Sequence, residues 1–535
     1  MDSERIDQLL GREFAQRDAN FLDYSVGRED ILARIRNCAR PFYLIVAPRG
    51  SGKSGLLLLL EDELARLSRT SSVIIKRYSD EVSLPPGRGP VEASVQFWKT
   101  TLLRWIVAEI GVRIDVPETT DEIFAVELAE QLGLRECEIG APPLDRSTSE
   151  ADARLPHVVK RLLEQSQKTF WLLLDEMDDF NIAIDERNVA IVGLLQACDA
   201  VSKLSPRIVA RVTIRPHILT YLKTNFDVVQ KFRDAELTVD WSETQLRDVL
   251  VRRIQRFDHQ LRRDQPQLNL VGPTNDRHQS NRDACRIISR YLADFDSSFK
   301  VGSSSDYRAL QTLSLRRPRW MIEFCAIALK KSASDFATAV SFHKAMHEYG
   351  RNRIQFLAGE HKTQLPDFAV WINRLTAARR SKFGSSEEFR DTLIEYLLRA
   401  DGVAVAERPA SPQEDADALT IAQALYMLEI VRAHQSAGGR DDHRFYRYTE
   451  SPELLASWST RANMTWEMHE TFSRALNIID NNTYSVGDEV RLFGERRSGS
   501  SGKNRRNRPG SRSRRRDALE KAGGGEDATS DDKEV

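Results

Sequence analysis

The sequence predicts an α/β fold with a five-stranded, mostly parallel sheet, followed by an α-helical lid and a further, mainly α region. An apolar run at residues 41–46 leads into a loop with two glycines and then into a leucine-rich helix. A second apolar run, at residues 169–174, ends in acidic residues, which is typical of a buried strand whose carboxyl end reaches an active site. From Ser242 onward, apolar residues recur at helical spacing.

Length and composition limit the classes of protein to consider. The chain has 535 residues, which is too long for one hydrophobic core and predicts about three domains. Its net charge of −1 points to no particular partner. The first residues lack the order of a signal peptide, and no apolar run approaches the roughly 18–20 residues of a membrane span, so we expect a cytoplasmic protein without a membrane partner. The five cysteines contain no CxxC pair, which predicts reduced thiols.

The glycine loop fits the phosphate-loop pattern of nucleotide-binding proteins. It consists of Ala47, Pro48, Arg49, Gly50, Ser51, Gly52, Lys53 and Ser54, with Ala47 in place of the usual first glycine. Gly50 and Gly52 let backbone N–H groups face the β- and γ-phosphates, Lys53 supplies a positive charge, and the Ser54 hydroxyl reaches a Mg²⁺ ion. The pattern predicts binding of ATP with Mg²⁺, and the alternative is a plain glycine-rich turn.

The acidic residues after the second apolar run have the order of a Walker B motif. Asp175 is expected to hold Mg²⁺ through water, and Glu176 stands where a general base would orient and deprotonate the attacking water. Asp178 and Asp179 remain open between a helix-capping or solvated role and a metal role. Because this motif follows the phosphate loop in the correct order, the sequence predicts an ATPase core.

Three more strands are expected at residues 72–78, 206–214 and 235–239. Arg215 ends the second of these, and taken alone it can be a structural, salt-bridged arginine. Residues 81–168 exceed what a minimal nucleotide domain needs at this point, so we expect helical insertions there.

The helical half carries further candidates. On the helix after Ser242, five arginines are expected on the faces away from the apolar one: Arg252, Arg253, Arg256, Arg262 and Arg263. Arg319 is the best candidate for a lid arginine that reaches the nucleotide, Arg317 is the next, and surface charge is the alternative. His343 and His347 lie one helical turn apart, but Lys344 stands where a zincin has glutamate, which favours surface histidines.

The last part of the chain predicts a small helical module and a tail. Helices are expected at residues 341–358, 366–378, 386–400 and 419–434, and an aromatic strand follows from His443, which favours a winged-helix-like region. Residues 496–516 contain ten basic residues and no acidic one, and the end of the chain is mostly acidic. We expect this tail to be disordered, with the basic block able to hold nucleic acid or to fold back on the acidic end.

A Val-Gly-Arg-Glu box begins at Val26, about twenty residues before the phosphate loop, and taken alone it is only a helix start. Together with the two nucleotide motifs and Arg215, it resembles the bacterial P-loop ATPases of the AAA+/STAND assemblage, which include NACHT, NB-ARC and initiator-like proteins. The resemblance implies that Val26, Gly27 and Arg28 pack against adenine, that Arg215 senses the γ-phosphate, and that Arg319 acts from the lid.

The resemblance also implies a domain order. It gives an N-terminal helical lead (1–19), a P-loop ATPase domain (20–242), a helical lid (243–335), a winged-helix-like region (336–495) and a tail (496–535). Two functional classes follow. One is a nucleotide-dependent switch with slow ATP hydrolysis and a protein partner or self-association, in bacterial signalling or phage defence. The other is an initiator- or loader-like ATPase that acts on DNA through the winged-helix-like region and the basic tail.

Overall fold

The computed structural model describes most of the chain up to residue 478. The described residues are 1–12, 15–67, 72–78, 85, 89–134, 148–166, 168–178, 184–264, 286–292, 307–362, 365–399, 411–436, 443–448, 451–459 and 464–478. They belong to one compact unit, Met1–Phe493. Asp179 and the tail predicted for residues 496–535 lie outside the described residues.

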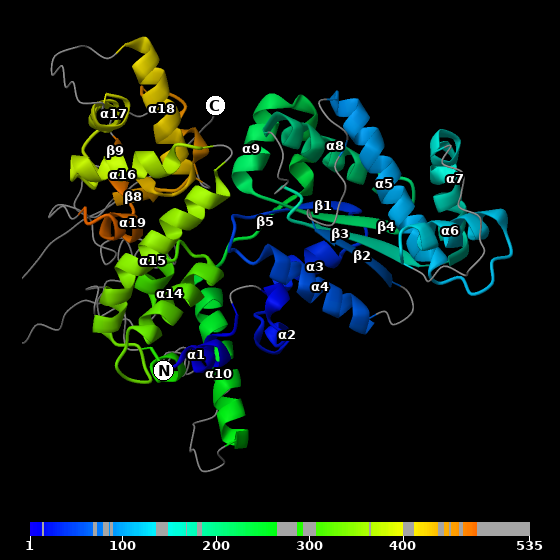
Figure 1. Ribbon diagram of the computed structural model, residues 1–535, viewed down its shortest axis with the longest axis horizontal. Helices are drawn as coiled ribbons and strands as arrows, with labels where there is room; N and C mark the ends of the chain where they lie inside the picture. Colours follow the sequence, from blue (N-terminus) through cyan, green and yellow to red (C-terminus); the bar gives the residue numbers. More distant parts are fainter. Residues whose placement is uncertain are drawn as a thin grey trace, which may run out of the picture. The chain divides into compact units, whose positions relative to one another are not determined.

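A five-stranded sheet forms the centre of the first half (Figure 1). Its strands are β1 (Phe42–Val46), β2 (Ser72–Tyr78), β3 (Thr169–Asp175), β4 (Ile208–Ile214) and β5 (Glu236–Thr238). The strand order is β2-β3-β4-β1-β5, and every neighbouring pair is parallel. This confirms the predicted P-loop NTPase fold, with a sheet that is parallel throughout. Because β1 lies between β4 and β5, the loops after β1, β3 and β4 meet at one edge of the sheet.

Helices cover both faces of this sheet, which explains the unbroken apolar runs in its strands. One face carries α3 (Glu29–Arg36) and α4 (Lys53–Leu67), and the other carries α5 (Val91–Gly111), α8 (Ile184–Ser202) and α9 (Pro216–Asn225) (Figure 1). Alternate residues of β1 point to opposite faces: Tyr43 and Ile45 join the α3/α4 core, and Leu44 joins the α5/α8 core.

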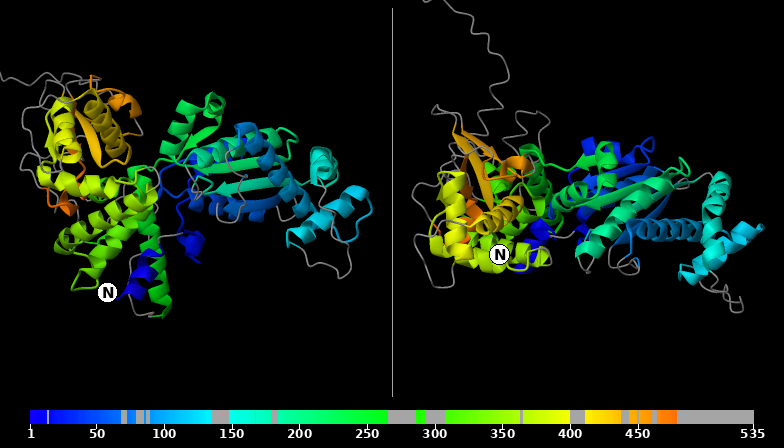
Figure 2. Two further views of the ribbon diagram at one scale, coloured as in Figure 1. Left: turned by 45° about the horizontal axis from the view of Figure 1, so that its top comes forward. Right: turned by 90° about the horizontal axis from the view of Figure 1, so that it is seen from above.

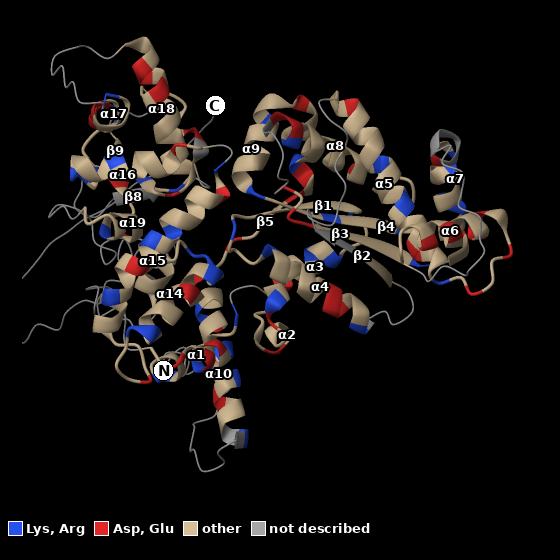
Figure 3. Cartoon of the chain, in the orientation of Figure 1, with Lys and Arg blue, Asp and Glu red and all other residues tan. Residues whose placement is uncertain are grey.

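The insertion before β3 is helical, as predicted. Helix α6 (Thr120–Gln131) and helix α7 (Thr148–Ser166) pack against α5, and Figure 2 shows them beyond the end of the sheet. Helix α6 begins with a capping box between Thr119 and Glu122, in which each side chain accepts a backbone N–H. Its charged residues are all acidic, and they appear as a red group in Figure 3.

The second half is built on one hydrophobic cluster that includes the N-terminal helix α1 (Ser3–Leu10). The helices that follow the sheet are α10 (Glu243–Asp264), α13 (Arg308–Leu313), α14 (Pro318–Lys330) and α15 (Ala339–Glu360). Helix α1 packs against α10 and α14. Two short N-terminal elements, η1 (Ala15–Arg17) and α2 (Phe21–Tyr24), continue from it, with η1 against α4 and α2 against α10.

The C-terminal region combines helices with a four-stranded antiparallel sheet of order β6-β9-β7-β8 (Figure 2). The helices in the described part of this region are α16 (Phe368–Ala378), α17 (Ser386–Leu393), η4 (Ile394–Leu398), α18 (Pro412–Met427), η5 (Pro452–Leu455) and α19 (Glu470–Ala475). Its strands are β6 (Lys382–Phe383), β7 (Val431–Ser436), β8 (His443–Tyr446) and β9 (Met464–Met468).

The helix predicted for residues 419–434 was wrong at its carboxyl end. Helix α18 stops at Met427, and Glu429 takes a left-handed conformation with a φ of 58°, which turns the chain. The following residues then pair as strand β7, with Val431 opposite Met468. Tertiary pairing therefore overrides the helical periodicity here.

The two histidines predicted to lie on the surface are solvent-accessible. His343 is exposed and His347 is partly exposed. Among the described residues, no group of three or more His, Cys, Asp or Glu side chains could hold a metal ion. No helix in the described part of the chain has both the length and the apolar character needed to span a membrane.

Arg211 on β4 is a fully buried arginine that ties α3 to the sheet. Its guanidinium donates to the carbonyls of Ile35 (2.5 Å) and Asn37 (3.0 Å), at the end of α3. It also lies over the rings of Tyr43 and Trp171, 5.0 Å and 5.2 Å from their centroids. These contacts fasten the helix that follows the Val-Gly-Arg-Glu box.

We predict that Arg211→Met lowers the free energy of unfolding by about 2 kcal/mol, because buried carbonyls lose their donors and the methionine cannot replace them. Urea unfolding followed by circular dichroism measures the change. Arg66→Met is the control, because the Arg66 side chain is 74% exposed and pairs with Asp62 on its own helix. A loss below about 0.5 kcal/mol for Arg211→Met would show that these contacts contribute little.

Candidate nucleotide-binding site

The phosphate loop connects β1 to α4. Gly50 and Gly52 have φ values of 86° and 87°, a conformation that side-chain-bearing residues rarely adopt. The turn brings the chain into α4 at Lys53, and the Leu56 N–H donates to the Gly52 carbonyl at 2.9 Å. The N-terminus of α4 therefore faces the loop, and its unpaired N–H groups favour an anion there.

The Lys53 ammonium lies inside this loop. Its Nζ donates to the carbonyls of Ala47 (2.6 Å) and Pro48 (3.4 Å). Burial lowers the pKa of Lys53, and the nearby Asp178 opposes that shift. Phosphate oxygens are stronger acceptors than these carbonyls, because the hydrogen bond to an ionised oxygen is charge-assisted. The lysine is thus placed to exchange carbonyl partners for a phosphate.

The end of β3 holds two carboxylates in different settings. Asp175 is buried, and its Oδ1 accepts from the Thr213 hydroxyl at 2.6 Å. Its Oδ2 is also buried and has no hydrogen-bond partner among the described residues, which fits an oxygen reserved for a hydrated Mg²⁺ ion. Glu176 has a φ of 56°, which is uncommon outside glycine, and this conformation directs the backbone away from the strand. Glu176 lines the cleft itself.

Asp178 and Arg215 form a buried charge cluster with a residue from α15. Asp178 is only 2% exposed, and it accepts the backbone N–H of Arg215 at 2.6 Å, so it is not the solvated aspartate allowed by the sequence. The Arg215 guanidinium lies 3.8 Å from Asp178 Oδ1 and 3.4 Å from Glu360 Oε1. The Glu360 side chain is 4% exposed. The strand-end arginine is therefore salt-bridged to the helical half of the chain.

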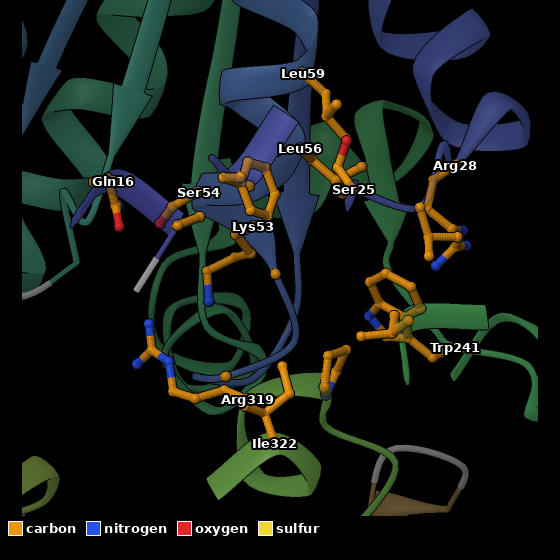
Figure 4. Close-up of a pocket in the computed structure, with 18 of the residues that line it drawn as sticks. Gln16, Ser25, Arg28, Lys53, Ser54, Leu56, Leu59, Trp241, Arg319 and Ile322 are labelled. Atoms are coloured by element: carbon orange, nitrogen blue, oxygen red, sulfur yellow. The ribbon is translucent and has the colours of Figure 1, made fainter. Parts of the chain in front are cut away.

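The start of α14 and the segment before α10 touch the phosphate loop. The Arg319 N–H donates to the Gly50 carbonyl at 3.3 Å, and the Trp241 indole N–H donates to the Ser51 carbonyl at 2.7 Å. Figure 4 shows Lys53, Ser54 and Arg319 along one side of the cleft. Arg317 does not line this cleft, since its guanidinium pairs with Glu429 at 3.0 Å.

The Val-Gly-Arg-Glu segment forms another wall. Val26 and Arg28 are buried and line the cleft. The Arg28 guanidinium pairs with Asp30 at 3.0 Å and lies 5.1 Å from the centroid of the Trp241 ring, and Figure 4 shows these two side chains together. The charge of Arg28 lowers the pKa of Asp30 through their hydrogen bond. Gly27 does not line the cleft.

The cleft is open to solvent, and about 1000 Å³ of space lies between its walls and the surrounding solvent. The predicted residues that line it are Val26, Arg28, Arg49, Gly50, Gly52, Lys53, Ser54, Glu176, Arg215 and Arg319. The predicted residues that do not line it are Gly27, Ala47, Pro48, Ser51 and Asp175. Ser51 and Asp175 still position residues that line the cleft. The Ser51 carbonyl accepts the Trp241 indole N–H, and Asp175 accepts the Glu176 N–H.

Several lining residues were missed from the sequence. They include Gln16, Phe21, Tyr24, Trp241, Val249 and Arg253. An aromatic residue just before the helix start at Ser242 was a usable signal for Trp241. Arg253 was expected on a surface face, but it is 6% exposed. Nothing local marks a helical arginine as buried, because its position depends on the N-terminal segment packed over it.

Two solved structures are similar to this chain at low sequence identity. No protein-family model and no curated protein sequence matches the chain. The Aeropyrum pernix ORC2 protein, in ADPNP–ADP complexes, is 12% identical with a TM-score of 0.40, over 90% of this chain and 99% of that one. Cdc6p from Pyrobaculum aerophilum is 13% identical with a TM-score of 0.28, over 89% and 92%. Scores at this level carry no argument about activity or partners, and they do not bear on the NACHT and NB-ARC part of the resemblance.

The hydrogen bond from Thr213 to Asp175 can be used to test whether Asp175 helps to hold Mg²⁺. We predict that Thr213→Val weakens the affinity for MgATP about tenfold, because the hydroxyl that orients the carboxylate is lost. Calorimetric titration with Mg²⁺ present should reveal the loss, and titration of ATP with excess EDTA should not. Thr224→Val is a matched control, because Thr224 is exposed on α9 and its hydroxyl donates to the Thr220 carbonyl of the same helix. Equal losses with and without Mg²⁺ would assign Thr213 to the fold instead.

Proposed function

We propose that this protein binds ATP with Mg²⁺, hydrolyses it slowly, and uses the nucleotide as a switch. The observation that carries the proposal is the composition of one cleft. The phosphate loop, the end of β3, the end of β4 and the start of α14 all contribute charged side chains to it. A site with Lys53, Arg215 and Arg319 around a helix N-terminus suits a group with several negative charges.

The predicted residues in the cleft and next to it have the following proposed roles. Lys53 and the loop N–H groups bind the β- and γ-phosphates, and Ser54 and Asp175 hold Mg²⁺, which neutralises phosphate charge when bound. Glu176 acts as the general base that orients water for attack on the γ-phosphate. Val26, Gly27 and Arg28 belong to the segment that packs against the base.

The switch proposal depends on the partner of Arg215. Its guanidinium now pairs with Glu360, at the carboxyl end of α15. A γ-phosphate within reach of Arg215 would compete with that carboxylate, because both are anionic acceptors for the same donors. ADP lacks the competing group. Binding of ATP would therefore weaken a contact between the nucleotide domain and the helical half, while ADP would leave it intact.

Lys53→Ala tests the site itself. We predict that it abolishes measurable ATP binding, because the phosphate loop loses its only lysine in a site for several phosphate charges. Calorimetric titration of the folded variant measures the affinity. Lys203→Ala is the control, since Lys203 is exposed and pairs with Asp199 on α8. Near wild-type affinity in Lys53→Ala would overturn the assignment.

Glu176→Gln separates hydrolysis from binding in the same experiments. The amide keeps the shape of the side chain but cannot accept a proton from water, so ATP affinity should stay and phosphate release should fall by about a hundredfold or more. Unchanged turnover would place the base elsewhere.

Glu360→Gln tests the switch. We predict that it raises the affinity for ATP by about three- to tenfold and leaves ADP unchanged, because Arg215 loses a competing carboxylate. Arg215→Ala should have the opposite signature, with a larger loss for ATP than for ADP. Dissociation constants for both nucleotides on both variants provide the measurement. Equal effects on ATP and ADP would mean that this ion pair stabilises the fold and does not respond to the γ-phosphate.

The second candidate is an initiator- or loader-like ATPase that acts on DNA. The combination of helices α16–α18 with the antiparallel β6–β9 sheet supports it, because a winged-helix module, which is our prediction for this region, presents a helix to the major groove. A gel shift with duplex DNA at several salt concentrations, with the full chain and with a chain ending at residue 495, distinguishes the two candidates. Salt-dependent binding supports the DNA role, and no shift at low salt contradicts it.

A further inference from the structure

Helix α10 contributes a buried cation to the cleft. The Arg253 side chain lines the cleft and the residue is 6% exposed. Its Nε and Nη1 atoms are buried and donate to no acceptor among the described residues. Its guanidinium stacks on the Tyr24 ring, 4.4 Å from the centroid, which fixes its plane without satisfying its N–H groups.

The neighbouring arginines on α10, Arg252 and Arg256, have oxygen partners for their guanidinium groups. Arg252 donates to the Ser25 carbonyl at 2.6 Å, and the Arg256 Nε lies 3.6 Å from Asp23 Oδ2. All three arginines thus face the short N-terminal helix α2, but two of them have oxygen partners. Arg253 is the one that lines the cleft.

Asp18 is the carboxylate whose charge acts on Arg253, and its oxygens have other hydrogen-bond donors. Asp18 accepts the backbone N–H of Arg12 at 2.8 Å and of Asn20 at 3.1 Å, and it also accepts the Tyr24 hydroxyl. Burial lowers the pKa of Arg253 to about 10, and the charge of Asp18 opposes this shift, so the guanidinium is charged at neutral pH. A buried charge with unpaired donors is costly unless a ligand supplies acceptors.

The surroundings of Arg253 suit the nucleoside part of a nucleotide. Val249 lies one helical turn before Arg253 on α10 and also lines the cleft, as do Val26 and Tyr24 from the N-terminal segment. Apolar and aromatic walls of this kind bind the flat face of a base. The residues proposed to bind phosphate, Lys53, Ser54 and Arg319, line the same cleft (Figure 4).

We propose that Arg253 is a nucleoside-recognition residue, which donates hydrogen bonds to acceptor atoms on the base or the ribose of the bound nucleotide. The inference rests on the proposed function, since it concerns the same cleft. A guanidinium has five donors and no acceptor, so it selects ring nitrogens, carbonyls or ribose oxygens and cannot pair with an amino group. The Tyr24 ring fixes the plane of the Arg253 guanidinium, and Val249 is part of the apolar wall that would contact the base.

The test compares ATP with inorganic tripolyphosphate, which has the phosphates and lacks the nucleoside. Arg253→Met should weaken ATP binding by about ten- to a hundredfold and leave the affinity for tripolyphosphate within about twofold. Arg256→Met is the matched control, because Arg256 lies on the same helix, also faces Tyr24 and does not line the cleft. It should leave both affinities unchanged.

Two outcomes overturn the inference. One is an unchanged affinity for ATP in Arg253→Met, and the other is an equal loss for ATP and tripolyphosphate, which would indicate damage to the phosphate side or the fold. If Arg253→Met does not fold, Arg253→Lys replaces it, and the same difference between the two ligands is expected. Failure of the proposed function looks different, because the wild-type protein would then bind neither ligand.

Titration with 2′-deoxyATP locates the acceptor. If Arg253 donates to the ribose 2′-oxygen, the wild-type protein binds 2′-deoxyATP less tightly than ATP, and Arg253→Met adds no further loss. If the acceptor is on the base, Arg253→Met weakens 2′-deoxyATP as much as ATP. Either pattern supports nucleoside recognition, and an Arg253→Met variant that binds both nucleotides like the wild type contradicts it.

Discussion

The gathering of buried charges at one edge of the parallel sheet is the constraint on which the rest of the structure depends. Lys53, Asp175, Asp178 and Arg215 all come from loops or strand ends at this edge, and all are removed from water to a large extent. Charges in such a place need partners. The loop carbonyls partner Lys53, Thr213 partners Asp175, and Glu360 is recruited from the helical half to partner Arg215. The need to compensate charge therefore links the two halves of the chain.

That link explains why the cleft is built from parts far apart in the sequence. The N-terminal segment contributes Tyr24 and Val26, the sheet contributes the phosphate loop, and the helical half contributes Arg253 and Arg319. Direct hydrogen bonds to the carbonyls of Gly50 and Ser51 bring the helical half onto the phosphate loop itself. A ligand in the cleft would touch all of these segments at once, so its binding energy can depend on how they are arranged.

The parts that could be predicted from the sequence are those specified by neighbouring residues. The five strands and the phosphate loop have local patterns of apolar residues and glycines, and the carboxyl ends of parallel strands must meet at one edge. The partner of Arg215 could not be predicted, because Glu360 follows 145 positions later and nothing in its own helix marks it. Arg253 was predicted to be on the surface because the segment that buries it is distant in the sequence. Helix α18 was predicted to continue past Met427 because the apolar periodicity continues, but the left-handed conformation of Glu429 turns the chain there.

The central claim is that a triphosphate in this cleft takes Arg215 from Glu360. A crystal structure with Mg²⁺ and a non-hydrolysable ATP analogue tests it most directly. The account predicts the γ-phosphate within hydrogen-bond distance of Arg215, the metal near Ser54 and Asp175, and a separation between Arg215 Nη1 and Glu360 Oε1 greater than the present 3.4 Å. An analogue bound in the cleft with the Arg215–Glu360 pair intact would contradict the switch, and an analogue bound elsewhere would contradict the site.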